Sequence, residues 1–192
     1  MSLDTSRPQV DESAERDQFP GVLPGKPVPF VLEKGEGEKS VLFGDLFTIM
    51  LTGDETEGQY DVFAVEGHAG NIIPAHLHLW THEIFYVVDG AVHVWMDDEH
   101  GTRADKVLQT GDFAYVPKNV VHAYRFEATS KVFGTSTAGF GRFFHAMGRK
   151  TDKPGIPGRD EIFVPSREQM QAAGEKYGTV FRPEFTFDQV AD

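Results

Sequence analysis

The sequence contains no cysteine among its 192 residues. Disulfide bonds and thiolate metal ligands are therefore excluded, and any metal site must use nitrogen and oxygen donors. Basic residues are also few, since 18 Lys and Arg stand against 30 Asp and Glu and give a formal net charge of −12. This balance speaks against nucleic acid and anionic membrane surfaces as partners, because both are bound by clustered Lys and Arg.

Long apolar runs are missing as well. No stretch reaches the roughly 18 apolar residues that a membrane-spanning helix needs, so we expect no membrane association. Residues 1–17 are polar and acidic and lack the apolar segment of a secretory signal. Together these features predict a cytoplasmic protein.

What the sequence does contain is a series of short β-type segments. Apolar residues make up 40% of a chain long enough for one domain with a real core. The segments are bounded by Gly, Asp and Asn, with few helical patterns between them, which predicts an all-β antiparallel barrel or sandwich. The candidate strands are 41–51, 59–66, 72–78, 83–88, 91–97, 106–109, 113–116, 120–127 and 131–137.

The pattern divides the chain into three parts. Residues 1–23 begin with a polar segment that lacks hydrophobic periodicity, and we expect a mobile N-terminal arm. Residues 24–148 form the predicted barrel, which includes a short helix near its end. Residues 149–192 form a C-terminal extension that packs on the barrel. A capping box, Ser166 with Gln169, opens the helix of this extension.

Three histidines and one glutamate form the clearest candidate site. Residues two apart in a strand point to the same face, so His76 and His78 project together. Glu83 opens the next strand after a four-residue loop, and His122 lies in a later strand. A buried glutamate beside three imidazoles is costly unless a cation compensates it. The sequence therefore predicts one divalent transition metal held by His76, His78, Glu83 and His122.

Aromatic side chains are expected around this metal. By strand alternation Phe85 shares the face of Glu83, while Tyr124 and Phe126 share the face of His122. Phe63 is a further candidate for the same cavity, and Trp80, in the loop between ligands, is a candidate gate. Such a lining suits a planar aromatic substrate. The alternative, that these rings only fill the barrel core, stays open.

The ligand spacing resembles the two sequence motifs of the cupin family. Gly70, His76, His78, Glu83 and Gly90 match the first motif at every anchor, and Gly111, Pro117 and His122 match the second. Two positions depart from the second motif: Asn119 stands where Gly is frequent, and Phe126 where Asn is frequent. The resemblance implies a single cupin, an antiparallel jelly-roll β-barrel.

A longer resemblance extends beyond these motifs. Residues 24–50, 73–95, 111–126 and 141–148 resemble bacterial single-cupin quercetin dioxygenases. This implies ring-opening dioxygenation of a flavonol such as quercetin, with O₂ as co-substrate and a depside and carbon monoxide as products. It also implies a homodimer, and a metal held by the four residues above. Nickel is favoured, although cobalt, manganese, iron or copper also occur in the family.

Two further expectations concern mechanism and assembly. Glu83 is the predicted general base for the flavonol 3-hydroxyl, because no other carboxylate is expected at the metal. The outer face that carries His93 and Trp95 is the predicted dimer contact, since a tryptophan is more favourable when covered.

Two other functions remain possible for a metal cupin. One is a metal-dependent isomerase or epimerase, against which the interior is aromatic rather than rich in Lys and Arg. The other is a non-enzymatic, metal-bound small-molecule sensor, against which no DNA-binding segment is evident.

Overall fold

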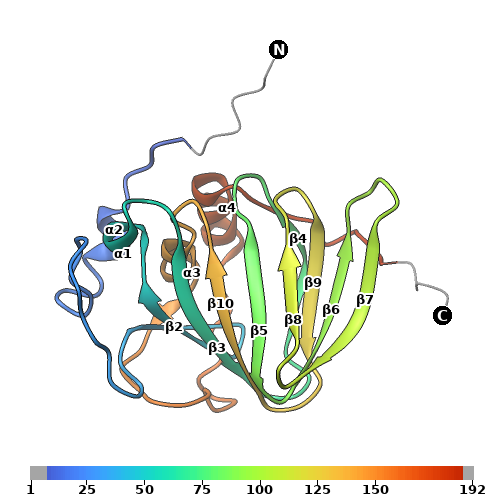
Figure 1. Cartoon of the computed structure of the whole chain (residues 1–192), viewed down its shortest axis with the longest axis horizontal. Coiled ribbons are helices and arrows are strands. Elements are labelled where there is room, and N and C mark those ends of the chain that lie inside the picture. The colour runs from blue at the N-terminus through green and yellow to red at the C-terminus, as the bar shows by residue number, and fades with distance from the viewer. Residues whose placement is uncertain (1–7, 188–192) are drawn as a thin grey trace.

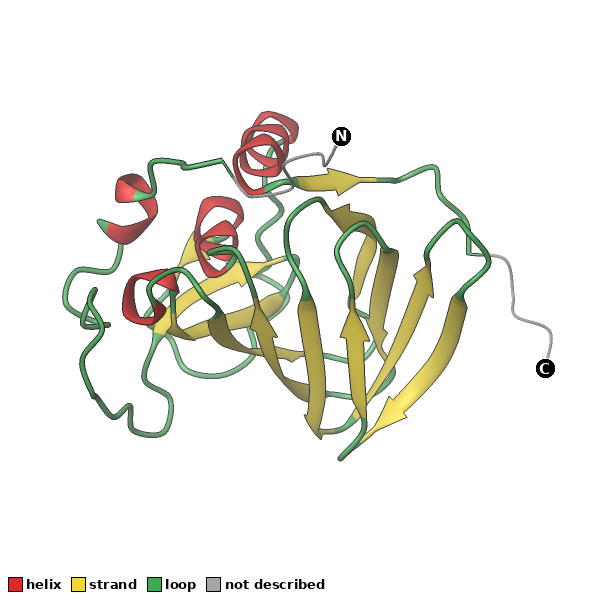
Figure 2. Cartoon of the chain, turned by 45° about the horizontal axis from the view of Figure 1, so that its top comes forward, coloured by secondary structure: helices red, strands yellow, loops and turns green. Residues whose placement is uncertain are grey.

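The computed structural model describes residues 8–187, and their strands form two antiparallel sheets (Figures 1 and 2). The larger sheet runs in the order β11 (Arg149–Lys150), β1 (Glu38–Leu42), β2 (Asp45–Leu51), β3 (Asp61–Gly67), β10 (Ser130–Ser136), β5 (Glu83–Asp89) and β8 (Phe113–Val116). The smaller sheet runs β12 (Thr179–Phe181), β4 (Ile72–His78), β9 (Val121–Phe126), β6 (Ala91–Asp97) and β7 (Arg103–Gln109). The helices are α1 (Ser13–Arg16), α2 (Gly53–Thr56), α3 (Gly141–Met147) and α4 (Arg167–Tyr177).

Alternation along the strands builds the core between the sheets. In β5, Phe85 and Val87 are buried, whereas Tyr86 and Val88 between and after them are exposed. The inner faces of both sheets contribute to one apolar cluster, to which α3 adds aromatic side chains. This two-sheet arrangement confirms the predicted jelly-roll β-barrel.

Strand boundaries follow the sequence pattern except near the N-terminal end. The strands predicted at 72–78, 91–97 and 113–116 have the predicted bounds. The single strand predicted at 41–51 is wrong, because β1 and β2 pair across a two-residue turn formed by Phe43 and Gly44. Both turn residues have positive φ, 53° and 91°, as a tight hairpin requires. A phenylalanine at the first position concealed this turn, since Asn, Asp or Gly is usual there.

Both chain ends pack on the barrel as far as they are described. Within the predicted arm, α1 forms and Phe19 and Leu23 are buried, while residues 1–7 lie outside the described residues. Within the predicted C-terminal extension, β11 pairs with β1 and β12 pairs with β4. Residues 188–192 again lie outside the described part.

The C-terminal helix begins where the capping signal placed it. Ser166 accepts a hydrogen bond from the Gln169 backbone N–H at the first turn of α4. This helix lies against α3, and α3 contacts β1, β2 and β3. Between residues 8 and 187, no helix is both long and apolar enough to cross a membrane.

Candidate metal centre

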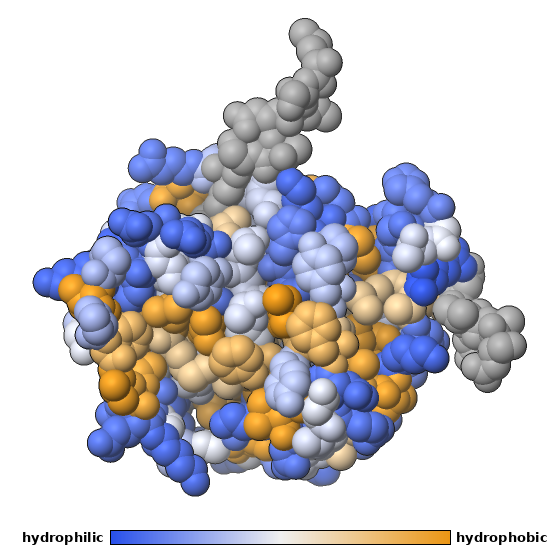
Figure 3. All heavy atoms as spheres, viewed as in Figure 1, coloured by the Kyte–Doolittle hydropathy of each residue, from blue (hydrophilic) through white to orange (hydrophobic). Residues whose placement is uncertain are grey.

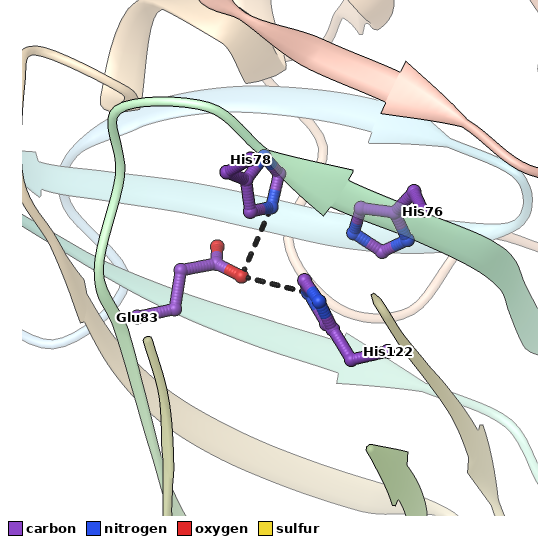
Figure 4. A group of neighbouring side chains, drawn as sticks. All are labelled: His76, His78, Glu83 and His122. Carbon is purple, nitrogen blue, oxygen red and sulfur yellow. Dashed lines mark hydrogen bonds and ion pairs between the residues drawn. The ribbon is translucent and has the colours of Figure 1, made fainter. Parts of the chain in front are cut away.

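Three strands bring the predicted ligands to one point inside the barrel. His76 and His78 lie on β4, His122 lies opposite His76 on β9, and Glu83 begins β5. Figure 4 shows the four side chains pointing toward one another. All four are buried, and each offers a ligand atom within 4.8 Å of the others.

Backbone carbonyls fix the orientation of two imidazole rings. His76 Nδ1 lies 2.8 Å from the Pro74 carbonyl oxygen, and His122 Nδ1 lies 3.0 Å from that of Val120. A carbonyl can only accept, so each Nδ1 carries the proton and donates it. In a neutral ring, Nε2 then presents a lone pair, which is the form that binds metals.

The third ring, His78, is held by a side-chain hydroxyl, which can donate or accept. Its Nδ1 lies 3.1 Å from Thr179 Oγ1, on β12. Its Nε2 is buried without a hydrogen-bond partner, although it lies 3.2 Å from Glu83 Oε2. His122 Nε2 is also 3.2 Å from this oxygen (Figure 4). Because His122 Nδ1 carries the proton, a neutral His122 ring would turn its Nε2 lone pair toward this carboxylate oxygen, and a proton or a cation between the two atoms would relieve the repulsion.

Electrostatics point to the same requirement. Burial lowers the pKa of His76 and His78 and so favours their neutral forms. Burial also opposes ionisation of Glu83, but the neighbouring His78 and His122 imidazoles outweigh it and hold the pKa of Glu83 below its ordinary value. Without a metal, only protons on the imidazoles can supply that positive charge. A divalent cation would supply it and leave every ring neutral, so the donor set fits a single divalent transition metal.

An apolar cavity of about 50 Å³ is lined by three of the four residues, His76, His78 and Glu83. Of the predicted pocket residues, Phe63, Phe85 and Tyr124 line it. Phe126 lines instead a second, smaller apolar cavity of about 10 Å³, which shares Phe85 and Tyr124 with the first. Phe126 thus faces the second cavity and not the one beside the predicted ligands.

Trp80 lines neither cavity. Its ring packs on Gly178, where an added Cβ would lie 2.4 Å from the ring. Gly178 ends α4 in the left-handed conformation, with φ of 71°. The absence of a side chain there makes room for the indole, which therefore supports the C-terminal helix rather than a cavity entrance.

A helical face missed by the sequence reading forms one wall of the cavity. Phe143, Phe144 and Met147 of α3, with Phe140 just before it, all line the cavity. Their spacing of three, four and seven residues is the signal of one helix face, and could have identified them. Phe47 on β2 and Phe181 on β12 add further aromatic rings.

The remaining histidines take other positions. His82 and His93 point away from the cluster, as predicted, and bond to Tyr115 Oη and Asp105 respectively. His68 and His100 are exposed. His145 is buried in a separate polar cluster on α3.

Comparison with known proteins agrees with this architecture. Residues 63–133 match the family model described as the cupin domain. The chain contains a cupin domain. The solved structure of an oxalate decarboxylase from B. subtilis superimposes on this cupin with a TM-score of 0.50 and 17% identity, covering 61% of this chain and 32% of that one. At that identity the likeness shows the fold alone.

Two curated relatives carry the same name. The cupin chain is 36% identical over 128 residues to quercetin 2,3-dioxygenase of Bacillus subtilis (strain 168), covering 66% of this chain. It is 29% identical over 100 residues to quercetin 2,3-dioxygenase of Aspergillus japonicus, covering 49% of this chain. The matched region amounts to 36% of the first relative and 28% of the second, so this chain spans about a third of their length. The cupin is thus quercetinase-like in sequence.

Proposed function

We propose that this cupin is a metal-dependent dioxygenase that cleaves the heterocyclic ring of flavonols with O₂, giving a depside and carbon monoxide. The observation that carries the proposal is the orphaned Nε2 of His78, which faces an apolar, aromatic cavity together with Glu83. The names of the two relatives supply the substrate class. Among the described residues, the cavity lining contains no Lys or Arg, which a sugar isomerase would use to bind its substrate.

His76, His78, Glu83 and His122 would hold the metal. When bound, the metal would supply Lewis acidity and electron transfer between the flavonol and O₂. Three imidazole nitrogens and one carboxylate oxygen suit nickel, cobalt, copper and iron, and the resemblance to bacterial quercetin dioxygenases favours nickel. The aromatic walls would orient a planar substrate and exclude water from the reaction.

The cavity must widen for this reaction. Its volume of about 50 Å³ compares with the ~300–1,000 Å³ of sites for drug-sized ligands. A flavonol can therefore bind only if side chains of the lining move.

Glu83 is the proposed general base that takes the proton from the flavonol 3-hydroxyl. No other carboxylate is among the residues that line the cavity. Tyr124 is unsuited, since burial raises the pKa of its phenol well above its ordinary value and the nearby Asp45 and Glu83 carboxylates raise it further. Because the pKa of Glu83 is low, its carboxylate must loosen from the imidazoles and the metal to accept the proton.

Aerobic bleaching of the yellow quercetin absorption tests the activity. Metal-loaded protein should bleach quercetin, release carbon monoxide in equal amount and stop when O₂ is removed. Reconstitution with single metals identifies the most active one. Quercetin that stays unbleached with every metal would reject the dioxygenase.

Variants of Glu83 test the proposed base. Glu83→Gln keeps a weak oxygen ligand but cannot take up the proton, and we expect turnover to fall by about 10²–10⁴-fold. Glu83→Asp should be less affected. Metal content of each variant is the control. If metal-loaded Glu83→Gln turned over within a few-fold of the unmodified protein between pH 6 and 9, Glu83 would be a ligand only.

We also propose a homodimer, with a contact surface other than the predicted one. Trp95 is covered within its own chain, by the His93 ring at 3.8 Å and the Arg125 guanidinium at 5.5 Å. An aromatic face lies instead on the larger sheet, and hydrophobic side chains cross this side of the molecule (Figure 3). We define it by Phe133 on β10, Tyr86 on β5, and Phe113 and Tyr115 on β8.

Size and position favour a second copy on the aromatic face. Phe133 is opposite Tyr86, and Tyr86 is opposite Phe113, so the rings form a row across three strands. With side chains of ~150–250 Å² that are about half exposed, the four aromatics offer roughly 400 Å², half of the ~800 Å² that each partner buries in a stable complex. The row ends at β8, the last strand of its sheet.

Light scattering at micromolar concentration tests the dimer. The unmodified protein should have twice the monomer mass, and Phe113→Glu should have the monomer mass. Val31→Glu, a matched change at a side chain that is 87% exposed elsewhere, should remain dimeric. A monomer mass for the unmodified protein would contradict the proposal.

A further inference from the structure

Few of the residues that line the metal cavity are exposed to solvent. Its lining residues are buried except for Phe43, Ile73, Pro74 and Phe181. These four residues come from the turn between β1 and β2, from β4 and from β12, and we call them the mouth. A molecule that enters the cavity beside these residues passes the ring of Phe43.

Phe43 differs from the other mouth residues in its backbone. Its φ of 53° lies in the left-handed region, where a bulky side chain is uncommon and costs conformational energy. The next residue, Gly44, also has positive φ, so the turn needs this conformation at both positions. Asn, Asp or Gly would fill the position of Phe43 with less strain. Such outliers concentrate at functional sites.

The turn is held in place by contacts that do not involve the ring of Phe43. The backbone N–H of Phe43 donates to the Phe163 carbonyl at 2.8 Å. An added Cβ on Gly44 would lie 3.2 Å from the Asn71 side chain and 3.4 Å from that of Ile162. The backbone is therefore anchored on both sides, while the ring of Phe43 is partly buried over the cavity.

We propose that Phe43 is a gate that determines which molecules reach the metal ligands, and that its strained backbone is retained for the ring it places at the mouth. This deepens the proposed dioxygenase function, since a flavonol cannot fit the closed cavity. Movement of one ring on an anchored turn opens the mouth and leaves the ligands in position.

A pair of substitutions isolates the strain. Phe43→Ala and Phe43→Gly both remove the ring, but only Gly relieves the left-handed conformation. The Gly variant should melt higher than the Ala variant by about 2–4 °C. Glu57, exposed at the end of α2 with φ of 55°, provides the reference, and Glu57→Gly should gain a similar amount over Glu57→Ala. If the Ala variant melted as high as the Gly variant, the claim that the backbone at Phe43 is strained would be rejected.

Metal uptake tests the gate without the proposed activity. The probe is Co²⁺, added to protein stripped of metal, with visible absorption reporting occupancy. Phe43→Ala and Phe43→Gly should take up Co²⁺ at least about tenfold faster than the unmodified protein. Tyr60→Ala, which removes a 45% exposed ring that lines neither cavity, should match the unmodified rate. Equal rates in all four proteins would overturn the gate.

Substrate range then separates the gate from the dioxygenase. In Phe43→Ala, the ratio of kcat/KM for a flavonol with a bulkier ring substituent to that for quercetin should rise by about tenfold. Faster Co²⁺ uptake combined with no flavonol cleavage by any of the proteins would support the gate and reject the proposed reaction. An unchanged uptake rate together with flavonol cleavage would reject the gate and support the proposed reaction.

Discussion

Two buried clusters in this protein each pair a glutamate with histidine, yet they satisfy the charge in opposite ways. The ligand cluster is His76, His78, Glu83 and His122. The anchor cluster, which joins β1 to α3, is Glu38, Ser40, Arg142 and His145. All eight side chains are buried.

The anchor cluster contains its own cation. Arg142 Nη1 donates to Glu38 Oε2 at 2.6 Å, and His145 Nε2 lies 2.8 Å from the same oxygen. The other nitrogen of the His145 ring, Nδ1, lies 3.0 Å from Ser40 Oγ, within hydrogen-bond distance. Arg142 also reaches Asp54 with its second nitrogen at 3.0 Å. Burial lowers the pKa of His145, so the arginine is the lasting positive charge.

The ligand cluster lacks any such residue. Its carboxylate faces imidazole nitrogens, and no Lys or Arg of residues 8–187 lines the cavity. In the anchor cluster the carboxylate and the arginine together hold α3 against β1, whereas the carboxylate of the ligand cluster has no arginine beside it. The same residue types therefore serve architecture in one place and the proposed metal binding in the other, and the distinguishing feature is the guanidinium.

The largest effect should come from removing an imidazole of the ligand cluster. His76→Ala or His122→Ala deletes one of three nitrogen donors, and each variant should lose most of its metal and all flavonol turnover. Elemental analysis after dialysis measures the metal, expected near one per chain in the unmodified protein. Ser40→Ala, at the anchor cluster, is the control and should keep its metal. Full metal retention by both histidine variants would remove the assignment.

Removing the arginine of the anchor cluster should affect stability instead. Arg142→Met leaves Glu38 buried without a cation, and we expect the free energy of unfolding to fall by about 3–5 kcal/mol. Urea unfolding followed by circular dichroism measures it. Adding Glu38→Gln to this variant should recover part of the loss, because the uncompensated charge is removed. A loss below 1 kcal/mol would show that the anchor cluster does not hold α3.

Another buried carboxylate, Asp45, belongs to neither cluster. Its contribution to the stability of the fold should depend on pH. Burial raises its pKa from 3.8 to about 7, against the hydrogen bond from Asn71. Because the folded pKa exceeds the unfolded one, the stabilising contribution is complete below pH 4 and is lost as the pH rises to about 7. The ~4 kcal/mol implied by the shift is an upper bound, and we expect about 2 kcal/mol after relaxation.

Asp45→Asn tests this assignment. The variant cannot ionise at this position, so the free energy of unfolding should vary less between pH 4 and pH 8 than in the unmodified protein. Urea titrations at pH 4, 6 and 8 provide the comparison, and Asp105→Asn, at a partly exposed site, is the control. Identical pH profiles for Asp45→Asn and the unmodified protein would contradict the raised pKa.

The smallest effect concerns the hydroxyl that orients one imidazole in each cluster. Thr179→Val removes the partner of His78 Nδ1 and should weaken metal affinity by about tenfold. Ser40→Ala removes the partner of His145 Nδ1 and should cost about 1 kcal/mol of stability with no change in metal affinity. Competition with a chelator measures the affinity. Equal affinity in Thr179→Val and the unmodified protein would show that the hydroxyl does not prepare the site.

Much of the ligand cluster could be predicted because three of its four residues lie close together in the sequence. His76 and His78 share a strand face by alternation, and Glu83 follows within one short loop. His122 could be predicted because it lies in a strand of its own and matches the second cupin motif. The turn at Phe43 was missed for an equally local reason, since its residue type contradicts its backbone conformation.

The sequence alone determined the all-β class, most strand positions, the ligand set and the acidity of the chain, because strand alternation and motif spacing depend on neighbours in the chain. Only the tertiary structure decided which rings line the cavity, because α3 and β12 come to the ligands from far along the chain. It also placed Trp80 on Gly178 and joined Glu38 to Arg142 across 104 residues. Contacts of that length depend on how the sheets and helices pack, which no local pattern records.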